Sequence, residues 1–245
     1  MERMLDPSAP PSDVPLSRRT AAESLPAVVP PPLGRVLVVA PHPDDETFGA
    51  GGTIHDLARL GYGVTVVVVT DGAASHAGLP ELAAIRRREA LHAMKALGVS
   101  AAPQFLDLPD GHVSDHREAL AARLRSLADD CALIIAPRSG DGHPDHEATA
   151  EAVIEAIMGV PEDRRPALWR YAIWAWQWEG VVDADLVGAA TWKVSKPGRI
   201  QRSQAVAAYC SQTVGVNAGR TTTEDPIVSA AMIADIECAD EVFWC

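Results

Sequence analysis

Short apolar runs alternate with longer amphipathic stretches along the chain from residue 35 onward. Compact β-branched runs predict strands, whereas apolar residues spaced three and four positions apart predict helices. Strands are expected at 35–40, 64–70, 103–108, 131–137, 168–176 and 187–194, and helices at 49–61, 79–98, 115–129, 146–158 and 196–209. This alternation is typical of βαβ units. The predicted fold is therefore α/β, a Rossmann-like three-layer sandwich with a mostly parallel central sheet.

The same pattern divides the chain into three expected segments. Residues 1–33 contain eight prolines, a density that interrupts helices and sheets, so they predict an extended arm that partly packs on the body. Residues 34–212 carry the alternating elements and form the predicted main domain. Residues 213–245 end in the apolar run "VFWC", which predicts docking on the domain or a subunit contact, and a homo-oligomer stays open.

Two ionisable clusters interrupt the apolar pattern, each directly after a predicted buried strand. The run "PHPDDE" at 41–46 follows the strand at 35–40, and "GHPDHEAT" at 142–149 follows the strand at 131–137. In α/β proteins, ligands bind at the carboxyl ends of the parallel strands. The two clusters are therefore expected on the same edge of the sheet, as two halves of one site.

The residue types in these clusters indicate a metal centre. Imidazole and carboxylate donors without a thiolate suit Zn²⁺ or a similar first-row divalent ion. Catalytic zinc usually keeps three protein ligands and one open position, which His42, one aspartate and one histidine of the second cluster would supply. His143 and His146 are three residues apart at a predicted helix start, so both reach the same side. Of two consecutive carboxylates, one can bind metal while the other acts as a base, and spacing leaves open which does which.

Other interpretations of the two clusters are weaker. Either cluster alone fits a solvated turn, and "HPDH" alone fits a helix N-cap followed by acidic residues. The glycines at 49, 51 and 52 do not form the dinucleotide pattern G-x-G-x-x-G, because the sixth position is Ile54. They are better explained by close backbone packing beside the charged turn.

Composition excludes several classes of function. The formal net charge of −12 disfavours nucleic-acid binding, which depends on Lys and Arg contacts to phosphates. No apolar run approaches the roughly 20 residues that span a bilayer. The first residues lack the apolar core of a secretory signal, and the four cysteines show no metal-type spacing. We therefore expect free thiols, a buried Cys131 and a cytoplasmic location.

At these two clusters the sequence resembles the zinc-dependent de-N-acetylases of the PIG-L and LmbE-like family. The family motifs (A/P)-H-P-D-D-E and H-P-D-H stand intact here as 41–46 and 143–146, and the resemblance covers about residues 34–212. Weaker shared features are "IRRREA" at 85–90, "LGV" at 97–99, "LPDG" at 108–111 and "SQ" at 211–212.

The resemblance assigns a role to each residue of the two motifs. It implies that His42, Asp45 and His146 bind zinc. It implies that Asp44 is the general base, that protonated His143 polarises the amide carbonyl, and that Asp145 supports His143. Glu46 is expected to play a supporting part at the entry of the following helix.

Substrate contacts are predicted more loosely. Arg86 matches a family arginine that contacts substrate, with a surface pair between Arg86 and Glu89 as the alternative. Asp110 in "LPDG" is a candidate for contact with a sugar hydroxyl. Trp174, Trp176 and Trp178 alternate on the predicted fifth strand, as a sugar platform or as core. The loop histidines His76 and His112 are expected at the surface.

The predicted function is zinc-dependent hydrolysis that removes an N-acetyl group from a GlcNAc-type amino-sugar conjugate. The expected partner is this small-molecule substrate, without nucleic acid and without a membrane span. A metal-dependent amidase acting on a thiol-sugar conjugate would use the same residues. A sugar-binding protein without catalysis is the alternative from a different class.

Overall fold

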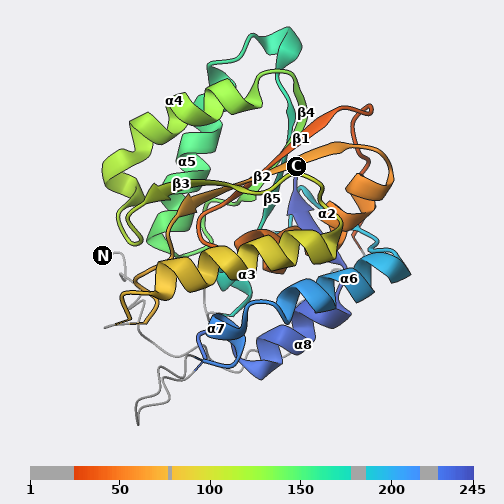
Figure 1. The fold of residues 1–245 in the computed structure, drawn as a ribbon. Coiled ribbons are helices and arrows are strands. Elements are labelled where there is room, and N and C mark those ends of the chain that lie inside the picture. The colour runs from red at the N-terminus through yellow and green to blue at the C-terminus, as the bar shows by residue number, and fades with distance from the viewer. Residues whose placement is uncertain (1–24, 77–78, 178–185, 216–225) are drawn as a thin grey trace.

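The computed structural model describes residues 25–76, 79–177, 186–215 and 226–245, which fold around one seven-stranded sheet. The strand order is β3-β2-β1-β4-β5-β7-β6, as Figure 1 shows in part. The strands are β1 (Arg35–Ala40), β2 (Gly63–Thr70), β3 (Gln104–Leu108), β4 (Cys131–Pro137), β5 (Ala167–Tyr171), β6 (Ala189–Trp192) and β7 (Glu241–Trp244). The predicted α/β class with a mostly parallel sheet is confirmed.

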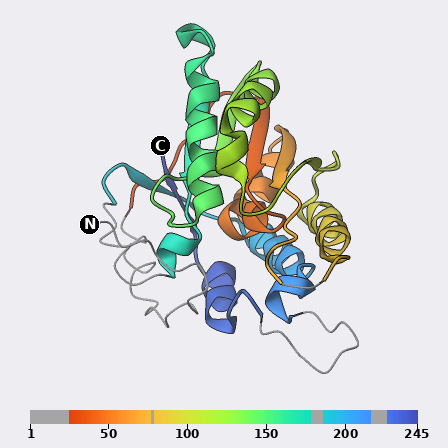
Figure 2. The same cartoon turned by 90° about the vertical axis from the view of Figure 1, so that its left-hand side faces the viewer.

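Helices cover both faces of the sheet (Figures 1 and 2). The α-helices are α2 (Asp45–Arg59), α3 (Leu82–Leu97), α4 (Arg117–Ala128), α5 (Pro144–Met158), α6 (Lys196–Val206), α7 (Cys210–Thr213) and α8 (Ala230–Cys238). Short 3₁₀ helices are η2 (Val113–His116), η3 (Glu162–Arg164) and η4 (Trp174–Trp176). Helices α4 and α5 pack on one face, and α2, α3 and α6 pack on the other.

Strand β1 is buried on both faces because its side chains alternate between two cores. Val36 and Val38 belong to the core under α2 and α3, whereas Leu37 and Val39 belong to the core under α4 and α5. Burial on both sides explains why this strand is continuously apolar, as central parallel strands are.

The chain order of the strands reverses around β1, which pairs in parallel with β2 on one side and β4 on the other. In doubly wound sheets a crevice forms at the carboxyl ends of the two strands that flank such a reversal. The runs "PHPDDE" and "GHPDHEAT" follow β1 and β4, so the topology places both at this point.

The helix after β1 starts earlier than the sequence pattern predicts. It begins at Asp45 rather than at residue 49, and its regular geometry is interrupted at Ala50 (φ −149°, ψ 17°). Three of the four residues from 49 to 52 are glycine, which has low helix propensity. The predicted glycine-started helix thus corresponds to the part of α2 beyond this break.

The fifth strand is shorter than predicted, and the alternating placement of its tryptophans is wrong. Strand β5 ends at Tyr171, and Trp174 and Trp176 lie in the 3₁₀ helix η4. The ladder ends because the Asp141 carboxylate accepts the N–H groups of Ile173 and Ala175 instead, at 2.8 and 3.0 Å. Trp178 lies outside the described residues.

Both ends of the described chain pack on the body. Strand β7 inserts antiparallel between β5 and β6, and helix α8 contacts α6. Ala27 bridges to Thr191, and the Tyr62 hydroxyl donates to the Pro31 carbonyl. None of the helices in the described ranges combines the length and hydropathy needed to cross a bilayer. The boundaries of the three predicted segments stay a prediction.

Candidate active site

The turn after β1 holds Asp44 in an unusual backbone conformation. Its φ is 131° and its ψ is −29°, a region that non-glycine residues rarely adopt. The Asp44 carbonyl accepts the N–H groups of Thr47 and Phe48, both at 2.9 Å, and so starts α2. Backbone strain of this kind, of order 1–3 kcal/mol, persists only where the surroundings hold it and clusters at functional sites.

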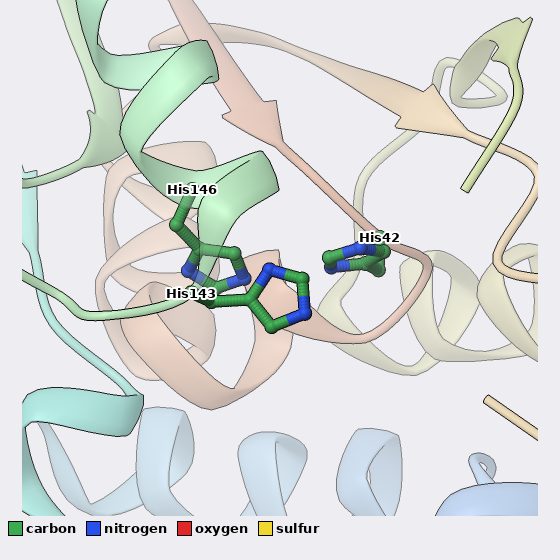
Figure 3. Close-up of side chains that lie close together, drawn as sticks. All are labelled: His42, His143 and His146. Carbon is green, nitrogen blue, oxygen red and sulfur yellow. The ribbon is translucent and has the colours of Figure 1, made fainter. Parts of the chain in front are cut away.

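The second cluster is built by ordinary helix capping. His143 is the N-cap of α5, Pro144 stands in the first turn, and the Asp145 N–H donates to His143 Nδ1 at 3.2 Å. His143 and His146 point from this helix start toward His42 across the site, as Figure 3 shows. The ring centroids of His143 lie 4.8 Å from His42 and 5.0 Å from His146.

Three donor atoms of the predicted metal ligands converge. Asp45 Oδ2 lies 3.1 Å from His42 Nδ1 and 3.1 Å from His146 Nε2. Two other groups have donor atoms that all lie within 4.8 Å of one another, and neither includes Asp45: His42, His143 and His146, and also His42, Asp110 and Asp145. The structure therefore brings all three predicted ligands together, and the cluster can hold a metal ion.

Carboxylates contact the second ring nitrogen of each histidine predicted to bind metal. His146 Nδ1 lies 2.7 Å from Asp141 Oδ2, and both residues are fully buried. His42 Nε2 lies 3.1 Å from Asp110 Oδ1 and 3.2 Å from Asp145 Oδ2. Such carboxylate–histidine pairs orient the imidazoles that bind metals. Asp110 and Asp145 contact His42 Nε2, whereas Asp45 lies next to His42 Nδ1. This arrangement favours His42, Asp45 and His146 as the ligand set.

Asp141 is a site residue that the sequence pattern did not predict. Its Oδ1 accepts the N–H groups of Ile173 and Ala175 at the start of η4, and its Oδ2 contacts His146 Nδ1 and so orients that ring. The residue stands five positions before His146, inside the glycine-rich run "SGDGHPDH". An isolated acid between two glycines at a strand end was the only available signal.

The burial and the donor types of these residues fit a divalent metal ion. His146 Nε2 is buried and makes no hydrogen bond with any described residue, although it lies 3.1 Å from Asp45 Oδ2. A buried polar nitrogen without a partner is costly, and a metal ion would satisfy it. Two imidazole nitrogens and one carboxylate oxygen are typical zinc donors.

Arg86 holds the turn that carries Asp44. Its guanidinium donates to the carbonyls of Gly72 and Pro43 at 3.0 and 2.8 Å, and to Asp44 Oδ2 at 3.0 Å. Burial raises the pKa of the Asp44 carboxyl well above its usual value, and the Arg86 charge opposes this rise. The alternative of a surface pair between Arg86 and Glu89 is wrong, because both are buried.

Glu89 and Glu46 are also buried, and each binds a residue of the C-terminal half. Glu89 accepts the N–H and hydroxyl of Ser211 at 2.8 and 2.6 Å. The Glu46 carboxylate accepts hydrogen bonds from the Tyr209 hydroxyl and from the Asp44 N–H, the latter at 3.3 Å. Glu46 thus supports the Asp44 turn from inside rather than contributing to the donor cluster.

The predicted partnership between Asp145 and His143 takes a different form. The Asp145 carboxylate accepts the N–H groups of Gly111 and Val113 at 2.7 and 3.1 Å and contacts His42, rather than the His143 ring. Burial and the neighbouring His42 and His146 lower the pKa of His143 to about 3. The expectation of a protonated His143 is therefore not what this environment favours, because two further imidazoles oppose its charge.

The remaining predicted residues divide between the site and the surface. Asp110 is half-buried in the site and accepts the Ala74 N–H at 2.9 Å. Trp174 is half-buried, and the centroid of its ring lies 6.3 Å from that of His143, with 25° between the ring planes.

His112 is exposed as predicted, whereas His76 is buried, so its expected surface position is wrong. Cys131 is buried as predicted, and its thiol is free.

Comparison with known proteins agrees with the motifs. The family model described as PIG-L: GlcNAc-PI de-N-acetylase matches residues 37–157. The Bacillus anthracis protein named "Probable N-acetyl-alpha-D-glucosaminyl L-malate deacetylase 2" is 33% identical over 56% of this chain and 65% of its own length. The Bacillus subtilis protein of the same name is 32% identical over 62% of this chain and 73% of its own length.

The fold also matches solved structures. The zinc-inhibited form of teicoplanin deacetylase Orf2 superposes with a TM-score of 0.60 at 25% identity, covering 74% of this chain and 85% of that chain. The chain spans about two thirds of the length of the Bacillus relatives. Their names and the two intact motifs agree with the predicted resemblance. This chain belongs to the PIG-L family of GlcNAc-PI de-N-acetylase-like proteins.

Proposed function

We propose that this chain is a zinc-dependent hydrolase that removes the N-acetyl group from a GlcNAc-type amino-sugar conjugate. The observation that carries the proposal is the position of Asp45 Oδ2, 3.1 Å from one nitrogen of each of His42 and His146. The strained Asp44 stands next to it in the chain. The names of the Bacillus relatives, N-acetylglucosaminyl malate deacetylases, support this substrate class.

His42, Asp45 and His146 would hold the metal. Bound Zn²⁺ supplies Lewis acidity and lowers the pKa of a coordinated water to about 7. Asp141 orients His146, and Asp145 and Asp110 orient His42, so the imidazoles present fixed lone pairs.

Asp44 is the proposed general base. Its buried carboxylate has a raised pKa, which makes it a better proton acceptor than an exposed aspartate. Arg86 binds Asp44 Oδ2 and prevents the carboxylate from rotating away. The same raised pKa allows protonated Asp44 to return the proton to the departing amine. Asp44, rather than His143, is therefore the proposed general acid for this step.

His143 is proposed to stabilise the oxyanion as a neutral hydrogen-bond donor. Its Nδ1 accepts the Asp145 N–H, which places the ring proton on Nε2. A neutral imidazole held in this way can donate to the oxygen of the attacked carbonyl without becoming charged. The low pKa of about 3 is consistent with this role and disfavours proton transfer from His143.

Two half-buried side chains are the proposed substrate contacts. Asp110 lies beside His42 and offers a carboxylate to sugar hydroxyls, and Trp174 presents an aromatic ring beside His143. Arg86 is committed to the Asp44 turn, so we now assign it to positioning the base. Its predicted contact with substrate stays a prediction.

The test is acetate release from a panel of N-acetylglucosamine glycosides by the purified chain, with metal content measured in parallel. Activity on malate-like or other polar glycosides that disappears on chelation and returns with Zn²⁺ is expected. Stoichiometric zinc with no acetate from any GlcNAc glycoside would overturn the proposal and favour a binding protein. Preferential cleavage of thiol-sugar conjugates would instead identify the amidase alternative.

A further inference from the structure

Helix α2 consists of two segments, and only the first carries site residues. The segments meet at Ala50, whose φ of −149° and ψ of 17° are not helical. The first segment begins at Asp45 in the metal site, and the second runs to Arg59 under the sheet. The direction of the first segment, and hence the position of Asp44 and Asp45, depends on how this break is held.

The break is capped by a carboxylate from the far end of the chain. Glu241 on β7 accepts the N–H groups of Gly52 and Thr53, both at 2.7 Å, across 189 and 188 residues of sequence. These N–H groups belong to the first turn of the second segment, and an unbroken helix would pair them with carbonyls four residues earlier. A carboxylate at this point also interacts favourably with the positive end of the segment.

A buried arginine holds the cap in place. Arg202 on α6 is 1% exposed and donates to Glu241 Oε1 at 2.9 Å, and Glu241 is 4% exposed. Its other terminal nitrogen donates to the carbonyls of Glu237 and Ala239 at 3.0 and 2.9 Å. Glu241 is therefore fixed from both sides, and a buried ion pair of this kind fails badly when one partner is removed.

The glycines at the break allow this approach. A Cβ on Gly52 would lie 2.4 Å from Val194 Cγ1 and 3.1 Å from Glu241 Oε1, and one on Gly49 would lie 2.4 Å from the Tyr171 ring. Tyr171 is fully buried on β5, next to β7 in the sheet. The C-terminal strand and its neighbours thus contact the backbone of α2 on both sides of Ala50.

We propose that Glu241, held by Arg202, is a positioning residue for the catalytic turn. It stabilises the break in α2, which directs the Asp45 end of the helix toward His42 and His146. Without this cap the two segments can join into one straight helix, which moves Asp44 and Asp45 relative to the two histidines. The proposal rests on the proposed function for its kinetic readout only. It also makes β7, which lies outside the matched residues 37–157, part of the site's architecture.

The main variant is Glu241→Gln, which keeps the size of the side chain and removes its charge. We expect kcat for deacetylation to fall about 10- to 100-fold, as ångström-scale misplacement of catalytic groups does, with KM within about twofold. Zn²⁺ affinity of the metal-free protein, measured by calorimetry, should fall, and amide exchange in the 45–59 peptide should rise. Glu237→Gln is the matched control: Glu237 lies on the preceding helix α8, and its carboxylate accepts a hydrogen bond from the Ser203 hydroxyl rather than from α2.

A second variant separates positioning from folding. Arg202→Met with Glu241→Leu replaces the buried pair by apolar side chains, which often restores stability. We expect its thermal midpoint to recover while kcat stays low and amide exchange in α2 stays raised. Recovery of kcat together with stability would show that Glu241 acts only through folding, and would overturn the proposal.

The exchange and calorimetry results also distinguish this proposal from the proposed function. If the wild-type chain releases no acetate, the proposed function fails, yet loss of α2 protection and of zinc affinity in Glu241→Gln still supports the positioning role. If Glu241→Gln changes neither the exchange of residues 45–59 nor zinc affinity, the positioning role is wrong, whatever the activity.

Discussion

The site has two halves, one after β1 and one after β4, which are similarly rich in ionisable groups. One half is built by local contacts and the other by contacts with distant parts of the chain. The half after β4 is local: His143 caps α5, Pro144 starts it, and His146 follows one turn later. The half after β1 is non-local, because Asp44 adopts a φ of 131° and is contacted by Arg86 and Glu46, while the proposed support from Glu241 comes from the far end of the chain. The half that requires strain is the one that carries the proposed base. The local half supplies a fixed frame against which that base can be placed.

Removing the base should produce the largest effect, on the strained half. Asp44→Asn keeps the size of the side chain and the contact with Arg86, but it cannot accept a proton. We expect kcat to fall by about 10²–10⁴-fold, measured as acetate release, with zinc content near one equivalent. Asp115→Asn, on the exposed surface, is the control. Wild-type turnover by the Asp44→Asn variant would show that Asp44 is not the general base.

On the local half, the most sensitive position is expected to be Asp141, behind His146. Asp141→Asn should lower zinc affinity by about 10- to 100-fold, because the imidazole loses the carboxylate that orients it. Competition with a fluorescent chelator measures this affinity. Asp163→Asn, an exposed acid, should leave it unchanged. Unaltered affinity in Asp141→Asn would show that His146 is oriented by other contacts.

A substitution of Arg86 tests whether the strained turn needs geometry or only charge. Arg86→Lys keeps the charge but cannot reach Gly72, Pro43 and Asp44 together, so kcat should fall about tenfold, the equivalent of one charge-assisted hydrogen bond. The substitution Arg88→Lys on the exposed face of the same helix is the matched control. Equal kinetics in the two variants would mean that positive charge alone is sufficient.

The smallest effect is expected at Trp174, next to the local half. Trp174→Ala should raise KM for a GlcNAc glycoside about fivefold, with little change in kcat, because an aromatic face for the sugar is lost. Trp174→Phe should give an intermediate KM. If kcat falls instead, Trp174 acts by holding His143 rather than by contacting substrate.

The same contrast explains what the sequence allowed us to predict. The strands near 35–40 and 131–137 and the meeting of the two ionisable clusters follow from local patterns and from parallel topology. The choice of Asp45 rather than Asp44 as the predicted ligand rests on the family resemblance. The end of β5, which depends on Asp141 some 32 residues away, leaves no periodic signal.

Burial of charged groups was the other feature that escaped prediction. Arg86 and Glu89 have the spacing of an exposed helical pair, yet each faces inward to a partner distant in sequence. The break in α2 was signalled only by its glycines, because the carboxylate that caps it lies 189 residues further along. Contacts of such separation are set by tertiary packing rather than by propensity.

Strand β7 is translated after every other strand of the sheet, yet it occupies an interior position between β5 and β6. During synthesis β6 therefore lacks its antiparallel neighbour until residues 241–244 emerge, and the edge of β5 stays open. Pairing across such long separations slows folding and leaves unpaired edges for other chains to bind. The parallel strands can therefore assemble before β7 is added, and the proposed Glu241 cap on α2 can form only once the C-terminal strand has been made.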